Sequence, residues 1–157
     1  MRPMEPKVVR MTSIGIVRRE SPEGDEKDRS IVARVVIDPD LTSALAGIEE
    51  WSHIYVVFYL HQMAQPRVSG IRPFRWIDHS FDGIYATRSP RRPNSIGLTL
   101  VELLRREENV LWVRGLDAQD GTPVLDLKPY PDWDRGQWIT VKEFRAPAWL
   151  REINKNS

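Results

Sequence analysis

Short runs of apolar and β-branched residues recur along the chain, and turns rich in proline, glycine and charge separate them. Runs of this length and composition are typical of β-strands. The pattern predicts strands at 12–19, 31–37, 52–60, 83–87, 96–104, 110–114 and 124–128. The 52–60 segment (SHIYVVFYL) is apolar on both faces, which predicts a strand at the centre of the sheet.

One helix is predicted between the second and third strands. Pro39 opens it, Asp40 is the expected cap, and apolar residues follow at helical spacing, namely Leu41, Leu45 and Ile48. Strands and helices do not alternate, and no glycine-rich loop joins a strand to a helix, so the usual nucleotide-binding fingerprints are absent. The sequence therefore predicts a mainly β protein: a small antiparallel β-barrel with one or two short helices and long loops.

The 157 residues fit one domain, which at this length buries about 70% of its unfolded surface. Residues 1–11 are predicted to be a flexible lead-in. Residues 12–157 are predicted to form the single barrel domain, ending in a tail that holds Trp133, Trp138 and Trp149. The chain shows no internal repeat and no linker of biased composition.

The composition of the chain excludes several kinds of site and a membrane span. The chain has no cysteine, which excludes disulfides, zinc–thiolate sites and thiol catalysis. None of its three histidines has the spacing of a metal ligand, so no metal site is expected. No apolar run approaches the ~20 residues of a membrane span, and the N-terminus lacks a signal-peptide core, so a cytoplasmic protein without a membrane partner is expected.

Charge is distributed unevenly, although the net charge is only +1. Residues 67–92 contain six arginines and two aspartates, whereas residues 116–134 contain five aspartates and one lysine. The basic half includes the segment 86–94 (ATRSPRRPN), here called the arginine loop, which Pro90 and Pro93 make stiff and non-helical. Stiffly held arginines lose little entropy on clamping a planar anion, although a solvated charged turn is the simpler interpretation.

Other motifs carry weaker signals. His61-Gln62 ends the central strand and offers hydrogen-bonding edges to a nucleobase or carboxylate, or simply caps the strand. The Gly115–Asp117 turn suits adenine or ribose contacts, and Lys128–Tyr130 puts a cation beside an aromatic ring. Ser89 has no nucleophile-elbow glycines, so serine hydrolase chemistry is rejected. Paired-carboxylate chemistry is unsupported, since turn formation explains an Asp-Gly pair.

Two long motifs together resemble the TrmO family. One is FDGIYATRSPRRPNSIGL at 81–98, and the other is LDAQDGTPVLDLKPY at 116–130. The segments IGIVR at 14–18 and FYLHQ at 58–62 also fit the family, in the right order. The loop after the first strand departs from the family: it is the short, acidic SPEGDEKDRS and lacks a Pro-Arg-Gln-Pro-Gly-like piece that contributes to the cofactor site elsewhere.

The resemblance implies a homodimeric β-barrel that binds S-adenosylmethionine near the dimer interface and methylates N6 of threonylcarbamoyladenosine beside the tRNA anticodon. It implies a cofactor site made of His61, Gln62, Arg88, Leu98, Gly115, Leu116, Asp117 and Ala118. The RNA would contact Arg91, Arg92, Asn94, Asp126 and Lys128. Asp120, Asp126, Lys128 and Tyr130 would line the same barrel mouth. Because the acceptor nitrogen holds a proton, a general base is expected, with Asp120 and Tyr130 as candidates.

Two other functions fit the same residues. A non-catalytic RNA-binding barrel would bind RNA through the arginine loop in a salt-sensitive way and would bind no cofactor. A methyltransferase for a small metabolite would bind the cofactor but not tRNA. Within the leading hypothesis, Arg88 is expected to serve the cofactor, while Arg91, Arg92 and Asn94 serve the RNA.

Overall fold

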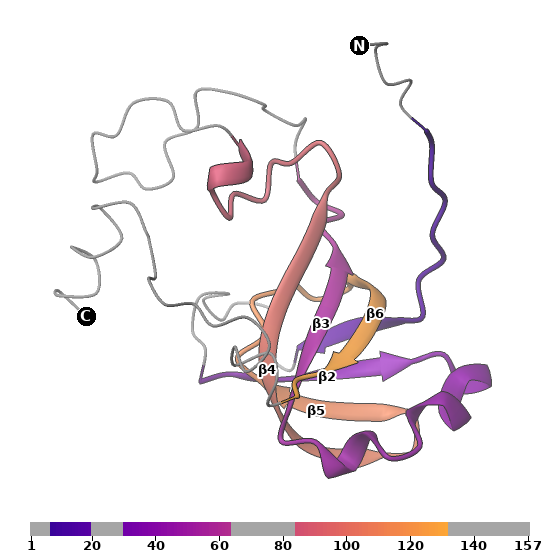
Figure 1. Ribbon diagram of the computed structural model, residues 1–157. Coiled ribbons are helices and arrows are strands. Elements are labelled where there is room, and N and C mark those ends of the chain that lie inside the picture. Colours follow the sequence, from indigo (N-terminus) through magenta and orange to yellow (C-terminus); the bar gives the residue numbers. More distant parts are fainter. Residues whose placement is uncertain (1–6, 20–29, 64–83, 132–157) are drawn as a thin grey trace, which may run out of the picture.

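Six antiparallel strands close into a barrel in the computed structural model, which describes residues 7–19, 30–63 and 84–131 (Figure 1). The order around the barrel is β1-β2-β5-β4-β3-β6, and β6 pairs with β1 to close it. The strands are β1 (Gly15–Arg19), β2 (Val32–Ile37), β3 (His53–Tyr59), β4 (Ile96–Glu107), β5 (Val110–Arg114) and β6 (Pro123–Pro129). The predicted antiparallel barrel is confirmed.

Inward-facing and outward-facing side chains alternate along the strands, and the inward-facing ones fill the barrel. In β3, Ile54, Val56 and Phe58 point inward and are at most 3% exposed, while the residues between them face outward. The same period holds in β2 and β5, whose β-branched residues suit a pleated, half-buried surface. β3 pairs with β4 and β6, but a closed barrel has no central strand, and only the inward face of β3 is fully buried.

The segment expected to be a strand at 83–87 is instead a 3-10 turn, η3 (Ile84–Ala86), within its described part. Ile84 is buried, and the Thr87 backbone amide and hydroxyl both donate to its carbonyl oxygen, at 3.2 and 3.0 Å. Tyr85 and Ala86 are both exposed, so the alternation of a half-buried strand is missing. The strand prediction was wrong because a short apolar run does not distinguish the two conformations.

The predicted helix is a 3-10 helix, η1 (Pro39–Leu45), followed by a second 3-10 turn, η2 (Ile48–Glu50). The cap is Asp38 and not Asp40, because the Asp38 carboxylate accepts the amide of Asp40 at 3.0 Å, across a proline that has no N–H. Leu45 joins the core, and Arg106 donates to Glu49 at 3.2 Å. Backbone hydrogen bonding and the Arg106 contact lower the pKa of Glu49.

The outer wall over β2, β5 and β4 carries a stack of cations and an indole ring. The Arg105 and Arg34 guanidinium carbons lie 4.0 and 5.4 Å from the Trp112 ring centroid. Arg114 adds an ion pair to Glu102 at 2.9 Å. These contacts join three neighbouring strands on the outside, where apolar packing contributes least.

Several expectations fall partly or wholly on residues that the structure does not describe. Residues 7–11 of the predicted lead-in lie in no helix or strand, while 1–6, most of the 63–81 loop and the tryptophan-rich tail lie outside the described residues. The domain boundaries therefore stay a prediction. Within the described ranges, no helix is long and apolar enough to cross a bilayer.

Candidate active site

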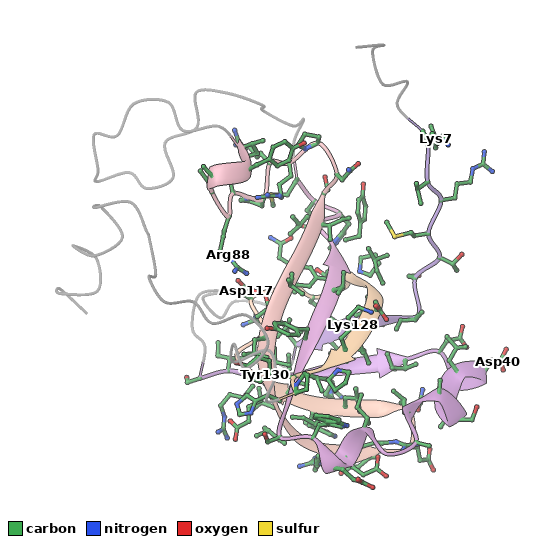
Figure 2. The ribbon with its side chains drawn as sticks, viewed as in Figure 1. Lys7, Asp40, Arg88, Asp117, Lys128 and Tyr130 are labelled. Atoms are coloured by element: carbon green, nitrogen blue, oxygen red, sulfur yellow. The ribbon has the colours of Figure 1, made fainter. Side chains whose placement is uncertain are left out.

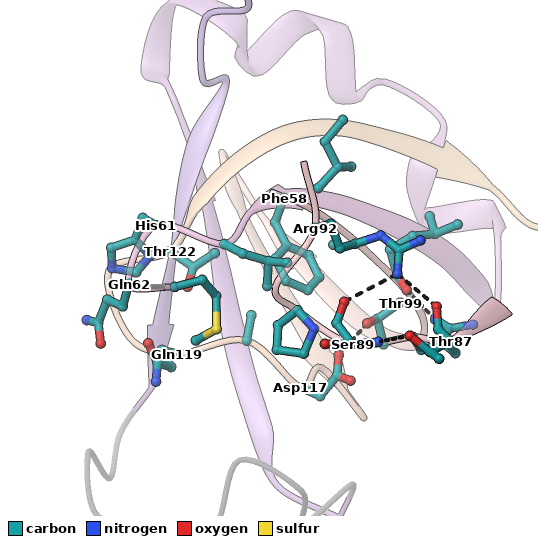
Figure 3. A pocket seen from close by; sticks show the side chains of 18 residues that line it. Phe58, His61, Gln62, Thr87, Ser89, Arg92, Thr99, Asp117, Gln119 and Thr122 are labelled. Carbon is teal, nitrogen blue, oxygen red and sulfur yellow. Dashed lines mark hydrogen bonds between the residues drawn. The ribbon is translucent and has the colours of Figure 1, made fainter. Parts of the chain in front are cut away.

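One end of the barrel holds a cavity of about 520 Å³, where β3 ends, β4 begins and the 115–122 turn crosses (Figure 3). This volume lies in the range of small-molecule sites. His61, Gln62 and Gln119 line one side, and Thr87, Ser89 and Asp117 the other (Figure 3). The remaining lining residues are Phe58, Leu60, Met63, Arg88, Pro90, Arg92, Ile96, Gly97, Leu98, Thr99, Ala118 and Thr122.

The arginine loop is held by its own side chains. The Arg92 guanidinium donates through Nη1 to the carbonyl oxygens of Thr87 and Ser89, at 2.8 and 3.2 Å. The Thr87 hydroxyl accepts the Ser89 amide at 3.2 Å, and the Ser89 hydroxyl accepts the Arg91 amide at 3.3 Å. Together with the two prolines, these bonds fix the loop without regular secondary structure.

Arg88 lies against the first half of β4. Its Nη2 donates to the carbonyl oxygen of Leu98 at 2.7 Å, while the side chain remains exposed at the cavity. This is the one hydrogen bond of the Arg88 side chain to the described residues, and a guanidinium carries five donors, so others remain for an anion. Arg88 is therefore a positioned cation in the cavity wall.

Asp117 provides the matching negative charge. Gly115 leaves β5 with φ 93°, which turns the chain back toward the cavity, and Leu116 is buried behind the turn. The Asp117 carboxylate accepts a hydrogen bond from the hydroxyl of Thr99, a buried residue of β4. Arg88 and Asp117 lie beside the same stretch of β4 (Figure 2), so the cavity presents both charges to one ligand.

The structure brings most of the predicted cofactor residues together. Six of the eight line the cavity: His61, Gln62, Arg88, Leu98, Asp117 and Ala118. The other two, Gly115 and Leu116, form the backbone turn and its buried anchor. Four segments far apart in the sequence therefore meet at one place.

Asp120 lies beside β1 and outside the cavity lining. Its Oδ1 accepts the Arg19 backbone amide at 2.9 Å, and its Oδ2 lies 3.6 Å from the Arg18 guanidinium. Arg19 is 8% exposed and donates to the carbonyl oxygen of Ala118 at 3.1 Å. Both carboxylate oxygens thus face β1, which is the geometry of a turn aspartate that fixes a loop.

Tyr130 lies at the other end of β3 from His61. Its amide donates to the carbonyl oxygen of His53, and its ring packs edge-to-face on Tyr55, with centroids 5.5 Å apart. Within one chain Tyr130 therefore lies away from the cavity that holds the predicted cofactor residues, and its expected role stays a prediction. A strand of this length separates the two ends by about 20 Å.

Asp126 and Lys128 also lie away from the cavity, on the outside of the barrel. They pair with Val57 and Tyr55 of β3, whose side chains alternate with the inward ones. Their charged groups are 2.8 Å apart, and this hydrogen bond raises the pKa of Lys128. Within one chain this pair therefore also lies outside the cavity, and its expected contact with RNA stays a prediction.

The three predicted RNA residues of the arginine loop differ in surroundings. Arg91 is exposed, and its side chain makes no polar contact with the described part of the chain. Arg92 is the internal clamp of the loop and also lines the cavity. Asn94 lines a second cavity of about 860 Å³, which adjoins Tyr59 and the 7–13 segment and shares Ile96 with the first.

Sequence reasoning missed Thr99 and Phe58, both of which shape the cavity. Thr99 is a polar residue on the inward face of β4, among Gly97, Val101 and Leu103. A lone polar residue in an inward apolar row was the available signal. Phe58 reads as ordinary core and gave no signal at all.

The fold and the site define a small-ligand-binding β-barrel with paired charges at one end. The family model described as "tRNA-methyltransferase O N-terminal domain" matches residues 12–134, and the chain belongs to this TrmO family. The resemblance carried by the two long motifs is thereby confirmed.

Curated relatives support the same family. A probable S-adenosyl-L-methionine-binding protein of Pyrococcus abyssi is 35% identical over 88% of this chain and 74% of its own length. One of Archaeoglobus fulgidus is 36% identical over 96% of this chain and 40% of its own length. A tRNA (adenine(37)-N6)-methyltransferase of mouse is 41% identical over 62% of this chain and 23% of its own length.

Solved structures share the fold. A crystal structure of TrmO from P. aeruginosa has a TM-score of 0.69 and 28% identity to this chain, covering 94% of this chain and 64% of that one. A second structure of TrmO has a TM-score of 0.65 and 29% identity. The chain thus spans less than two thirds of those solved chains.

Proposed function

We propose that this protein is an S-adenosylmethionine-dependent methyltransferase acting on N6 of threonylcarbamoyladenosine beside the tRNA anticodon. The observation that carries the proposal is the convergence of six predicted cofactor residues on one cavity in a TrmO-family chain. The relatives named as S-adenosylmethionine-binding or tRNA-methylating support it. The proposed location is the cytoplasm, in keeping with a chain that has no cysteine.

The charges of the cavity suit this cofactor. Its carboxylate would accept hydrogen bonds from the free donors of Arg88, whose other bond to Leu98 fixes the guanidinium in place. Its ammonium and sulfonium cations favour the Asp117 side, where Thr99 orients the carboxylate. His61 and Gln62 supply hydrogen-bonding edges for adenine on the opposite wall (Figure 3).

The reaction is an in-line displacement. The cofactor held by Arg88 and Asp117 would supply the methyl group: the N6 lone pair would attack the methyl carbon, and the breaking carbon–sulfur bond would leave its electron pair on sulfur, as a neutral thioether. N6 gains the methyl group and loses its proton. Holding nitrogen, carbon and sulfur in line supplies much of the acceleration, and a rigid loop and turn are suited to that.

The proton acceptor is proposed to be Asp117 in place of Asp120 or Tyr130. The positive charge moves from sulfur to nitrogen during transfer, so a carboxylate in the cavity wall stabilises it and can take the proton. The Asp120 carboxylate already accepts the backbone amide of Arg19 in β1, and Tyr130 lies at the far end of β3. Asp117 is the one carboxylate among the described lining residues.

RNA recognition is proposed for the exposed side of the arginine loop, with Arg91 as the main phosphate contact. Asn94 follows Arg91 by three positions on the same loop. Asp126 and Lys128 would contact RNA only beyond the cavity, on the outer wall. Arg92 would act on RNA indirectly, because its guanidinium holds the loop.

A homodimer is proposed through the outer face of β3 and β4. Large apolar side chains there are unusually exposed: Tyr59 46%, Ile96 38%, Leu98 48% and Leu100 38%. Such a surface fits a second copy of the same face in a two-fold dimer. Leu98 belongs both to this face and to the cavity, which would place the cofactor near the interface.

Calorimetric titration of the full chain with S-adenosylmethionine tests the proposal, with Arg88→Ala as the variant and Leu41→Ala as the control. Measurable binding that Arg88→Ala weakens is expected, and absence of binding to the folded chain refutes it and favours an RNA-binding barrel. Mass spectrometry of tRNA nucleosides after incubation then tests the substrate. Cofactor binding without methylated threonylcarbamoyladenosine would favour a small-metabolite methyltransferase.

A further inference from the structure

Tyr85 lies on η3 beside the cavity and is 78% exposed, more than any other aromatic residue in the described ranges. The cavity-lining residues Thr87 and Arg88 follow it by two and three positions. A tyrosine ring carries a large apolar area, so exposing it at a fixed position contributes little to folding. This exposure therefore points to a partner that covers the ring.

The backbone beneath Tyr85 is rigid. Ile84 is 1% exposed, and Thr87 closes the turn with two hydrogen bonds to the Ile84 carbonyl oxygen. Rigid presentation lowers the entropy cost of covering the ring.

A cation lies over the ring. The Arg92 guanidinium carbon is 6.0 Å from the Tyr85 centroid, and the carbonyl oxygens of Thr87 and Ser89 hold that guanidinium in place. The exposed Arg91 is its neighbour on the same loop. An exposed ring on a hydrogen-bonded turn, with one cation over it and an exposed arginine on the same loop, matches how proteins stack an unpaired nucleobase and bind its phosphate.

We propose that Tyr85 stacks on the unpaired base next to the target adenosine in the RNA substrate, an inference that rests on the proposed function. The target base must leave its stack to reach a cavity. Its neighbour then loses a stacking partner, and Tyr85 takes that place at the cavity's edge. An RNA partner is favoured over a protein because the ring is accompanied by arginines and by no exposed apolar neighbour on η3 apart from Ala86.

The test measures binding of anticodon stem-loop RNAs to the full chain by fluorescence anisotropy. Three RNAs are compared: the intact loop, and loops that are abasic at the 5′ or the 3′ neighbour of the target. Tyr85→Ala is expected to weaken binding of the intact RNA about 5- to 150-fold, the range of one base–aromatic stack. Tyr85→Phe keeps the stacking face and should bind nearly as tightly as the unmodified chain.

The abasic RNAs separate stacking from a general loss of affinity. The unmodified chain should bind one of the two abasic RNAs more weakly than the intact RNA. The Tyr85→Ala variant should bind that abasic RNA and the intact RNA with the same affinity. Cofactor affinity should stay unchanged in Tyr85→Ala, and Leu41→Ala, which truncates an exposed residue of η1, controls for surface truncation.

Three outcomes overturn the inference. If Tyr85→Ala binds and methylates RNA like the unmodified chain, Tyr85 has no role in RNA binding, while the proposed function survives. If Tyr85→Ala instead changes the sedimentation of the protein alone, the ring contacts a second copy. If the unmodified chain binds neither cofactor nor RNA, the proposed function fails as well.

Discussion

Replacing Gly97 by alanine tests whether the Phe58 ring sets the shape of the cavity. The two residues face each other across β3 and β4, and both line the cavity. A Cβ at position 97 would lie 2.2 Å from Cε2 and 2.4 Å from Cζ of Phe58. Non-bonded carbons pack at about 3.5 Å or more, so the ring must move by roughly 1.3 Å.

The cost of that movement follows from the packing. Phe58 is 3% exposed, and overpacking of a filled core costs about 1–3 kcal/mol. A glycine-to-alanine change also lowers the conformational entropy of the unfolded chain, which offsets about 0.4–1 kcal/mol of this cost. A net loss of about 1–2 kcal/mol lowers the melting temperature by about 2–8 °C in a domain of this size. Circular dichroism measures the melting temperature, and calorimetry measures the expected loss of affinity for S-adenosylmethionine.

A double-mutant cycle with Phe58→Leu isolates the contact. The smaller side chain gives room to the new methyl group, so the double variant should lose at least about 1 kcal/mol less than the sum of the single changes. The reasoning is refuted if Gly97→Ala keeps both its melting temperature and its cofactor affinity. Strictly additive changes would also show that the ring and the Cβ do not compete for space.

Three further predictions concern Asp120, the outer face and the arginine loop. Asp120→Ala should lower the free energy of unfolding by about 1 kcal/mol with cofactor affinity unchanged, because it removes the acceptor of the Arg19 amide. If denaturant unfolding shows full stability while activity is lost, Asp120 is again a candidate for the general base. Leu100→Asp should convert the proposed dimer into monomers in sedimentation velocity, and an unmodified chain that is already monomeric contradicts the proposed interface. Arg91→Ala should reduce the slope of log affinity against log salt by about 0.7–1 in RNA titrations, and an unchanged slope would remove Arg91 from the RNA contact.

The strands were predictable because burial in a barrel leaves a period of two in the sequence. β2 and β5 show this clearly, and both were placed within one residue of their observed bounds. The 84–86 turn was not predictable in this way. One buried residue, Ile84, anchors it, and the hydrogen bonds that close it come from Thr87, which a hydrophobicity pattern does not register.

The meeting of residues at the cavity was predictable where the motif itself forms the cavity wall, as for Arg88 and Asp117. It was not predictable for Lys128 and Tyr130, although the same motif contains them. That motif continues into β6, which pairs antiparallel with β3 in the barrel wall and carries these residues toward the other end of β3. Nearness in sequence therefore equals nearness in space only until a strand intervenes.

The arginine loop shows how one stiff segment gives three like residues different tasks. The Nη1 atom of Arg92 donates to two carbonyl oxygens of its own loop, so the guanidinium of Arg92 holds the loop backbone. Arg88, which follows Thr87, donates one hydrogen bond to the Leu98 carbonyl oxygen of β4 and lines the cavity as a cation. Arg91 lies between two prolines and points to solvent, free for a ligand outside. The proposed division between cofactor and RNA thus depends on Arg92, which in this geometry supports both partners through the loop it holds in place.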